Sequence, residues 1–283
     1  MHGTRTGLRA DATAQLADLE RRNPEWHAWL RLLREALRAF DDAAWSDGLG
    51  DPSGARAADA PLLHGRVLTV DSQRLGRLLQ DLAATAAATG LAGTQSLARY
   101  RFSAETDVDL LAAVLRHDRS RLEGLGALET VVRLASLPLL QACRRSLQQQ
   151  VPRPWPHGYC PICGSWPLLA ELRSLDRSRW LRCGRCGGDW PVSWLCCAFC
   201  GESDHERLGT LVLEGEPETL TVETCSNCSG YLKAITTLQA IPPFELLLRD
   251  LDTVDLDVAA LDRGFVRPEG DGFPLDLRVT GRL

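Results

Sequence analysis

Four Cys-x-x-Cys pairs lie within residues 160–228 and read CPICG, CGRCG, CAFCG and CSNCS. Their cysteines are Cys160, Cys163, Cys183, Cys186, Cys197, Cys200, Cys225 and Cys228. This spacing is typical of a metal-binding knuckle, a tight turn that points two thiolates at one ion. The glycine or serine after each pair suits such a turn. A tetrahedral site takes four thiolates, so four pairs predict two metal ions.

A metal site made of four thiolates is closed, because no coordination position remains for water or substrate. The residues therefore predict a structural or electron-transfer role and argue against hydrolysis. We expect no catalytic residues. Thiolates bind both iron and zinc, and the spacing of the cysteines does not separate the two metals.

The sequence between the pairs indicates which of them share an ion. Apolar and β-branched runs flank a polar turn between the first and second pairs, and again between the third and fourth, which predicts two β-hairpins. A hairpin returns the chain to its starting point, so the first four cysteines should share one ion and the last four the other. Interleaved pairing, disulfides and a catalytic dithiol are the alternatives.

The other two cysteines lie outside the pairs. Cys143 stands among apolar residues and is predicted to be a small buried side chain. Cys196 directly precedes Cys197, but its spacing to Cys200 does not fit the knuckle. We therefore expect Cys196 to be a buried neighbour of the site, and its role stays open.

The elements that position these residues begin with a helical region. Residues 1–150 are predicted to form an all-α domain, with helices starting at Asn23 and near Asp71 and others over 107–117 and 120–149. Apolar residues recur at three- and four-residue steps after Asn23. They are Trp26, Trp29, Leu30, Leu33, Leu37 and Phe40. Such a stripe is typical of a helix that packs on a core.

Three prolines between residues 152 and 156 predict an extended linker that ends the helical domain. Beyond it we expect two small tandem β domains of the zinc-ribbon type, at 151–195 and 196–240. A C-terminal helix and tail should follow at 241–283, with the helix ending near Gly264. The chain is therefore predicted to be a multidomain α+β protein. We expect the acidic residues of this last region to form a solvated face.

Bulk properties narrow the class of protein. The 283-residue chain carries a net charge of −5, which argues against a nucleic-acid-binding domain. Its first residues lack the apolar core of a signal peptide, and no later run approaches about 18 apolar residues. We therefore expect a cytoplasmic protein without membrane insertion. That reducing compartment favours metal ligands over disulfides.

The chain resembles the bacterial formate dehydrogenase accessory protein family, FdhE. The resemblance rests on CPICGS at 160–165, C-x-x-C-G-x-x-W at 183–190, and the segment 225–261, within which the acidic tail motif D-L-D-x-x-A-x-x-x-G-F begins at Asp255. The two Cys₄ units are similar to rubredoxin. Ser229 departs from that pattern, because glycine follows the other three knuckles.

The resemblance implies a cytoplasmic, non-enzymatic protein that binds iron through the eight knuckle cysteines. It also implies binding to the catalytic subunit of respiratory formate dehydrogenase, during maturation of that enzyme. Zinc is the alternative metal. A rubredoxin-like electron carrier and a zinc-ribbon nucleic-acid-binding module are the alternative functions, and the oligomeric state stays open.

Overall fold

The computed structural model places the chain in two compact units. The described residues are 4–40, 42–52, 56–90, 93–94, 97, 100–215 and 217–282. The helical unit comprises Met1–Arg56, Leu63–Ser146 and Leu275–Leu283, and the cysteine unit comprises Ala57–Leu62 and Leu147–Pro274. The main segment of the cysteine unit begins at Leu147, and the last residues of the chain belong to the helical unit.

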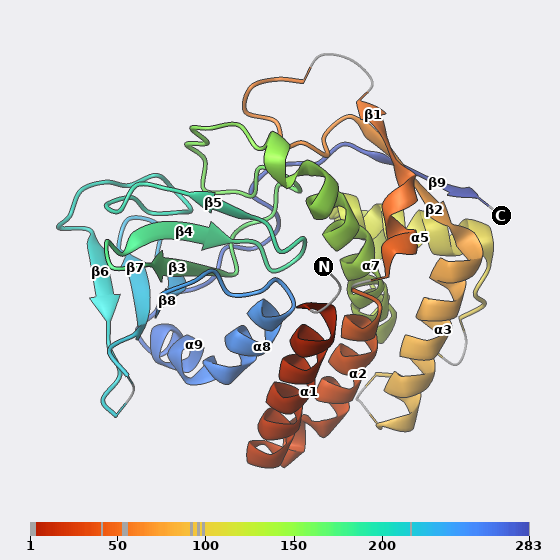
Figure 1. Cartoon of the computed structure of the whole chain (residues 1–283), viewed down its shortest axis with the longest axis horizontal. Helices are drawn as coiled ribbons and strands as arrows, with labels where there is room; N and C mark the ends of the chain where they lie inside the picture. The colour runs from red at the N-terminus through yellow and green to blue at the C-terminus, as the bar shows by residue number, and fades with distance from the viewer. Residues whose placement is uncertain are drawn as a thin grey trace. The chain divides into compact units, whose positions relative to one another are not determined.

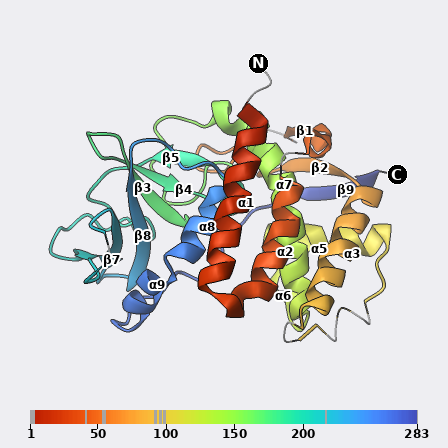
Figure 2. The ribbon, with the colours of Figure 1, turned by 60° about the horizontal axis from the view of Figure 1, so that its bottom comes forward.

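Helices make up most of the helical unit (Figures 1 and 2). They are α1 (Thr4–Arg22), α2 (His27–Arg38), α3 (Ser72–Ala88), α5 (Ala104–Arg116), α6 (Arg119–Leu122) and α7 (Ala127–Leu147), with 3-10 turns η1 (Pro24–Trp26) and η2 (Ala43–Gly48). The expected start near Asp71 is confirmed, because its carboxylate accepts the backbone N–H of Arg74 at 2.8 Å as an N-cap. Asn23 precedes the 3-10 turn and makes no such cap.

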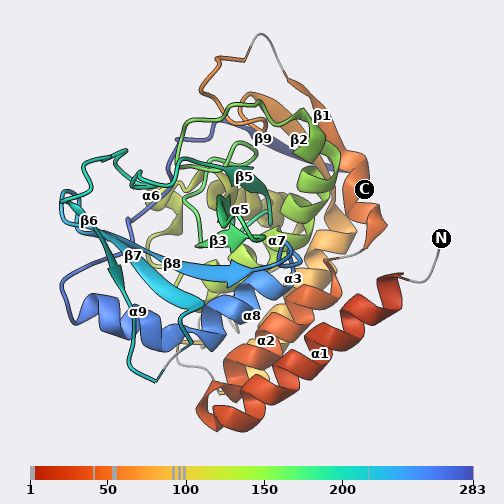
Figure 3. The ribbon, with the colours of Figure 1, turned by 60° about the vertical axis from the view of Figure 1, so that its left-hand side comes forward.

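Of the predicted apolar stripe, Leu30 and Leu33 of α2 and Phe40 just beyond its end are buried, as expected. The prediction is wrong for Trp29, whose exposed fraction is 47%. In the views of Figures 2 and 3, α1 runs alongside α2.

The front of the chain is not all-α, which corrects the prediction for residues 1–150. Strands β1 (Leu49–Pro52), β2 (Arg66–Asp71) and β9 (Arg278–Arg282) form a sheet in the order β1-β2-β9 (Figure 1). Strand β2 alternates, with Leu68 and Val70 buried. It pairs in parallel with β9, from about 210 positions later, with Val67 opposite Arg278. Local periodicity cannot reveal a partner this distant.

The cysteine unit is organised around a six-stranded sheet. Its strands are β3 (Leu169–Arg173), β4 (Ser178–Arg182), β5 (Asp189–Pro191), β6 (Leu208–Leu211), β7 (Leu220–Cys225) and β8 (Gly230–Thr237). Within the described part of the chain, their order is β5-β4-β3-β8-β7-β6. Neighbours pair antiparallel except β3 and β8, which run parallel with Ala170 opposite Ala234.

The two expected β domains, 151–195 and 196–240, are therefore halves of one sheet. The first six residues of β8 are buried, as are the first four of β3. Buried backbone N–H and C=O groups need partners, and the parallel pairing of β3 with β8 supplies them. Because this pairing joins the two halves, they differ from the separate domains that the sequence predicted.

Two short helices, α8 (Glu245–Asp252) and α9 (Val254–Leu261), lie along β7 and β8 (Figure 3). Leu256 and Ala260 of α9 pack against Val222 and Tyr231 of the sheet. The helix ends as expected near Gly264, whose φ of 80° is easy for glycine, while the N–H of the next residue donates to Ala260 O at 3.0 Å.

Among the helices of the described ranges, none has the length and apolar character that a membrane span requires.

Candidate metal centres

The first hairpin brings two knuckles together. Cys160 and Cys163 precede β3, and Cys183 and Cys186 follow β4. The β3–β4 register closes the loop between them. Cys160 Sγ lies 3.5 Å from Cys186 Sγ, and Cys163 Sγ lies 3.4 Å from Cys183 Sγ. These four residues are called the first cluster below.

The second cluster has the same construction. Cys197 and Cys200 precede β6, Cys225 ends β7, and Cys228 lies in the turn to β8. The Sγ atoms of Cys197 and Cys228 are 3.7 Å apart, as are those of Cys200 and Cys225. Within the described ranges, the knuckle cysteines thus form two sequential sets rather than interleaved ones.

Both clusters fit a divalent cation. In each, the four sulfur atoms all lie within 4.8 Å of one another. Tetrahedral zinc, with zinc–sulfur bonds of 2.3 Å, would require sulfur–sulfur distances of about 3.8 Å. The two distances of 3.7 Å in the second cluster are close to this value, and those of 3.5 and 3.4 Å in the first are slightly shorter. Iron in a Cys₄ site needs a similar arrangement.

The backbone of each knuckle folds back toward its sulfurs. Gly164, Gly187 and Gly201 follow the first three knuckles with φ of 77°, 71° and 75°. Each donates its N–H to the carbonyl of the first cysteine of its pair, at 2.9–3.0 Å. Ser229, after the fourth knuckle, adopts φ of 54°. Serine therefore takes the left-handed conformation that glycine takes in the other three, at a conformational cost.

Donors from the knuckles also reach the sulfurs directly. The N–H groups of Ile162, Cys186 and Phe199 lie 3.4 Å from the sulfurs of Cys160, Cys183 and Cys197 respectively. A hydrogen bond to a thiolate stabilises its charged form. The backbone thus prepares these sulfurs to serve as anionic ligands.

As free thiols, Cys160, Cys163 and Cys186 would not ionise together. Burial raises the pKa of Cys160 and of Cys186 well above the ordinary value. Hydrogen bonds from neighbouring thiols, chiefly that of Cys160, lower the pKa of Cys163. Four thiolates in this volume repel one another, so a cation is needed to hold them together.

In the second cluster, the pKa values of three thiols also shift in different directions. Burial raises the pKa of Cys197, and raises that of Cys228 to about 11. Burial also opposes ionisation of Cys200, but the backbone N–H of Glu202 and the Asn227 amide outweigh it and lower the pKa of Cys200 to about 7. One thiolate is thus readily available in this cluster.

The two clusters differ in exposure. All four cysteines of the first are at most 1% exposed. In the second, Cys197 and Cys225 are buried, but Cys200 and Cys228 are exposed. Spacing alone did not predict this difference, because the two hairpins look equivalent in sequence.

Neither remaining cysteine joins a cluster. Cys143 is buried, as predicted. Cys196 is only half-buried, which corrects the expectation of a buried neighbour, and its sulfur lies 3.6 Å from Cys197 O.

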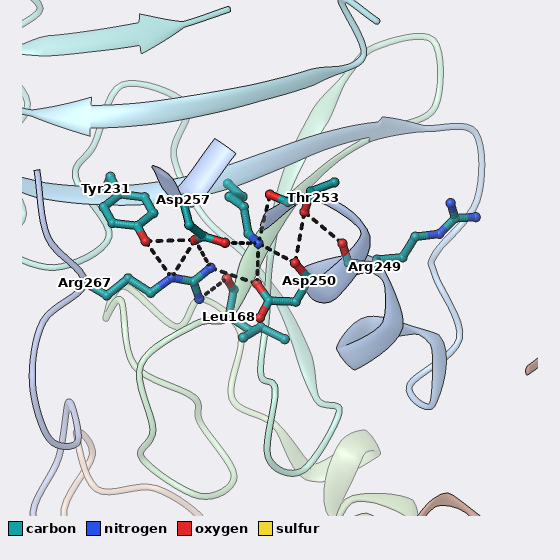
Figure 4. Close-up of polar contacts among 8 residues, drawn as sticks. Leu168, Tyr231, Arg249, Asp250, Thr253, Asp257 and Arg267 are labelled. Atoms are coloured by element: carbon teal, nitrogen blue, oxygen red, sulfur yellow. Dashed lines mark hydrogen bonds and ion pairs between the residues drawn. The ribbon is translucent and has the colours of Figure 1, made fainter. Parts of the chain in front are cut away.

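A charged network that the sequence did not predict lies behind the second hairpin (Figure 4). Lys233, in β8, is fully buried and makes ion pairs with Asp250 and Asp257 at 2.7 and 2.6 Å. Arg267 pairs with the same two carboxylates, each at 2.8 Å. The expected solvated acidic face is therefore wrong for these two aspartates. The available signal was Lys233 itself, the only lysine of the chain, within an apolar run.

Comparisons with known proteins found similar sequences and a similar solved structure. No family model matches the chain. It is 36% identical over 111 residues to a protein FdhE homolog of Stutzerimonas stutzeri, which covers 38% of this chain and 35% of that one. It is 31% identical over 121 residues to a protein FdhE homolog of Aquifex aeolicus, covering 41% of each. It is 32% identical over 111 residues to protein FdhE of Escherichia coli, covering 38% and 35%.

These matches span about a third to two fifths of the relatives' length. The fold is similar over a wider range. The crystal structure of the FdhE protein from Pseudomonas aeruginosa matches with a TM-score of 0.62 and covers 92% of each chain at 23% identity. The resemblance to the FdhE family is therefore confirmed, in sequence over part of the chain and in fold over most of it.

Proposed function

We propose that this chain is an FdhE protein, an accessory factor in the assembly or maturation of a formate dehydrogenase. The observation that carries the proposal is the pair of four-cysteine clusters within a fold that matches an FdhE crystal structure. The sequence similarity to three FdhE proteins supports it further. We place its action in the cytoplasm, where the cysteines stay reduced.

Its partner in this proposal is the catalytic subunit of the dehydrogenase. The eight knuckle cysteines serve as metal ligands, four to each ion, and the knuckle N–H groups hold their sulfurs in place. Iron is the proposed metal, and zinc is the alternative. Bound iron would supply a one-electron couple, whereas zinc would supply structure alone.

We further propose that the chain is not an enzyme. Four sulfurs complete the coordination of each ion, so the cysteines leave no position for a substrate. Buried Lys233 and the partly buried Asp250, Asp257 and Arg267 of Figure 4 pair with one another. They therefore act in folding, and they do not form an acid–base pair open to a ligand.

The direct test is anaerobic affinity capture of the tagged full-length chain from cells that make a formate dehydrogenase. Captured proteins are identified by mass spectrometry, and the metal of the bait is measured by elemental analysis. We expect the catalytic subunit to be captured, with close to two iron atoms per chain. Capture without that subunit would contradict the accessory role.

A matched pair of variants sharpens this experiment. Cys183→Ser removes a ligand of the first cluster, whereas Cys143→Ser changes a buried cysteine of the helical unit outside both clusters. We expect Cys183→Ser to lose metal and to capture less of the subunit, and Cys143→Ser to behave as the wild type. Equal capture by both variants would show that partner binding does not depend on the metal of the first cluster.

One observation favours a second candidate, a rubredoxin-like electron carrier. The exposed sulfurs of Cys200 and Cys228 would bring a redox ion close to the surface. Voltammetry of the iron-loaded protein tests this function. A reversible couple with rapid electron exchange would favour the carrier, and a redox-inert protein would exclude it.

A further inference from the structure

The first cluster is enclosed by chain segments that are distant in sequence but belong to the same unit. The N–H of Leu62 donates to Pro161 O at 2.7 Å, and the N–H of Phe273 donates to Gly164 O at 3.0 Å. The first knuckle is thus tied to the chain on both sides. An incoming molecule would have to displace these segments before it could reach a sulfur.

The second knuckle of the first cluster is enclosed as well. Gly188 lies so close to Cys186 that an added Cβ would stand 3.3 Å from its sulfur and 3.5 Å from Gln148 Oε1. The Gln148 amide donates to Asp189 O at 3.0 Å, which holds it in place. Trp190, from the adjacent strand, is fully buried. This packing explains why all four sulfurs of the cluster are shielded from solvent.

A distant segment also bonds to the second cluster, where the N–H of Val266 donates to Ser229 O at 2.8 Å, but two of the four cysteines stay exposed. Asn227 Nδ2 contacts Cys200 Sγ at 3.6 Å, from an exposed position in the turn between β7 and β8. Cys200 and Cys228 are exposed although their cluster has the same knuckle construction. The two clusters thus share ligand chemistry and differ in access.

Two surface hollows border the knuckle of Cys197 and Cys200. One, of about 340 Å³, is lined by Trp194, Leu195, Cys197 and Phe199 among others. The other, of about 640 Å³, shares Cys197 and Phe199 and extends to Trp155 and Trp166. The hollows thus border buried Cys197, whereas Cys200 and Cys228 are exposed to solvent directly.

We propose that the second cluster is an exchange site for its metal ion, whereas the first holds its ion as a permanent part of the fold. The inference rests on the metal-binding part of the proposed function and not on the dehydrogenase. Exchange proceeds through Cys200 and Cys228, and the entering ligand is a soft anionic donor, a thiolate or a chelator.

The step is a ligand substitution without oxidation or reduction. As the entering thiolate forms its bond to the ion, Cys200 or Cys228 gives up its own bond and keeps the electron pair. The departing thiolate then takes a proton from water. Cys197 and Cys225, which are buried, hold the ion during the exchange. The first cluster offers no exposed sulfur for the same step.

The test uses the full-length protein loaded with two zinc ions and mixed with an excess of a chromophoric chelator, 4-(2-pyridylazo)resorcinol. We expect two phases of about one zinc ion each, with rates at least tenfold apart. Cys200→Ser and Cys228→Ser should lose the fast phase and keep the slow one. Cys196→Ser is the matched control, because it changes a neighbouring sulfur outside the cluster, and it should keep both phases.

A second measurement needs no variant. The zinc-loaded wild type is treated with iodoacetamide during release, and the modified cysteines are mapped by mass spectrometry. Labelling of Cys200 and Cys228 in step with the fast phase is expected. Two ions that leave at one rate, or early labelling of the first cluster, would overturn the proposed exchange site. Either result would still agree with two metal centres. A chain that binds no ion would overturn both proposals.

Discussion

Lys233 Nζ lies 2.6 Å from Asp257 Oδ2, which joins the centre of the six-stranded sheet to α9. The ammonium group is fully buried and also lies 2.7 Å from Asp250 O. Arg267 donates to Asp257 Oδ1, as does the Tyr231 hydroxyl at 2.8 Å (Figure 4). Two cations thus face two carboxylates, and the acidic tail motif has a structural role.

Removing the ammonium group should destabilise the protein strongly. Lys233→Met keeps the length of the side chain but leaves two carboxylates in a partly buried place with only Arg267. We expect a loss of about 3–5 kcal/mol in the free energy of unfolding, measured by urea denaturation of the metal-loaded protein. Asp255→Asn changes an exposed acid of α9, the helix that carries Asp257. It should alter stability by less than about 0.5 kcal/mol. Similar losses in both would argue against the network.

The pKa of Asp257 gives the network a pH dependence. Burial opposes ionisation of this carboxyl, but Arg267 and Lys233 outweigh it and hold its pKa below the ordinary value of 3.8. The folded state therefore binds this proton less tightly than the unfolded state. The resulting stabilisation is fully present above pH 3.8 and is lost as the pH falls through the lower folded-state value. We expect the stability difference between wild type and Asp257→Asn to shrink on acidification below pH 4. A constant difference from pH 6 to pH 2.5 would contradict this assignment.

The two clusters should bind their ions separately. Cys160→Ser or Cys183→Ser should reduce the metal content from two ions to one, and so should Cys197→Ser or Cys225→Ser, because the four sulfurs of each cluster come from one hairpin. Elemental analysis after loading with excess metal measures this. A single variant that loses both ions would indicate that the shared sheet, through β3 and β8, makes the clusters interdependent.

The left-handed conformation of Ser229 predicts a stabilising substitution. Ser229→Gly removes the strain of a φ of 54° and should raise the free energy of unfolding by up to about 1 kcal/mol. The reverse change is available at Gly201, where φ is 75° and an added Cβ would meet nothing within 4 Å. Gly201→Ala should therefore cost about 1 kcal/mol through backbone conformation alone. Thermal unfolding of both variants measures the pair, and shifts of the same sign would refute the argument.

Local signals in the sequence were enough to find the cysteine clusters. A knuckle is defined by four or five consecutive residues. A short hairpin brings the chain back beside its starting point, so the grouping of the cysteines could be predicted. The helix start at Asp71 and the helix end near Gly264 depend on similarly local hydrogen bonds.

Pairings between distant segments could not be predicted in this way. Strand β2 meets β9 from the far end of the chain, and β3 meets β8 across about 60 residues. Both are parallel pairings, for which no connecting turn gives a signal. The same limit hid the partners of Lys233, because its two carboxylates lie on helices packed against the sheet.

The difference between the two clusters also comes from tertiary structure alone. Their knuckles have the same form in sequence, and both provide four sulfurs. Exposure is decided by the segments around Leu62, Gln148 and Phe273, which cover the first cluster. Ligand identity is thus a property of residue type and spacing. Access to the ligand depends on which distant parts of the chain pack over it.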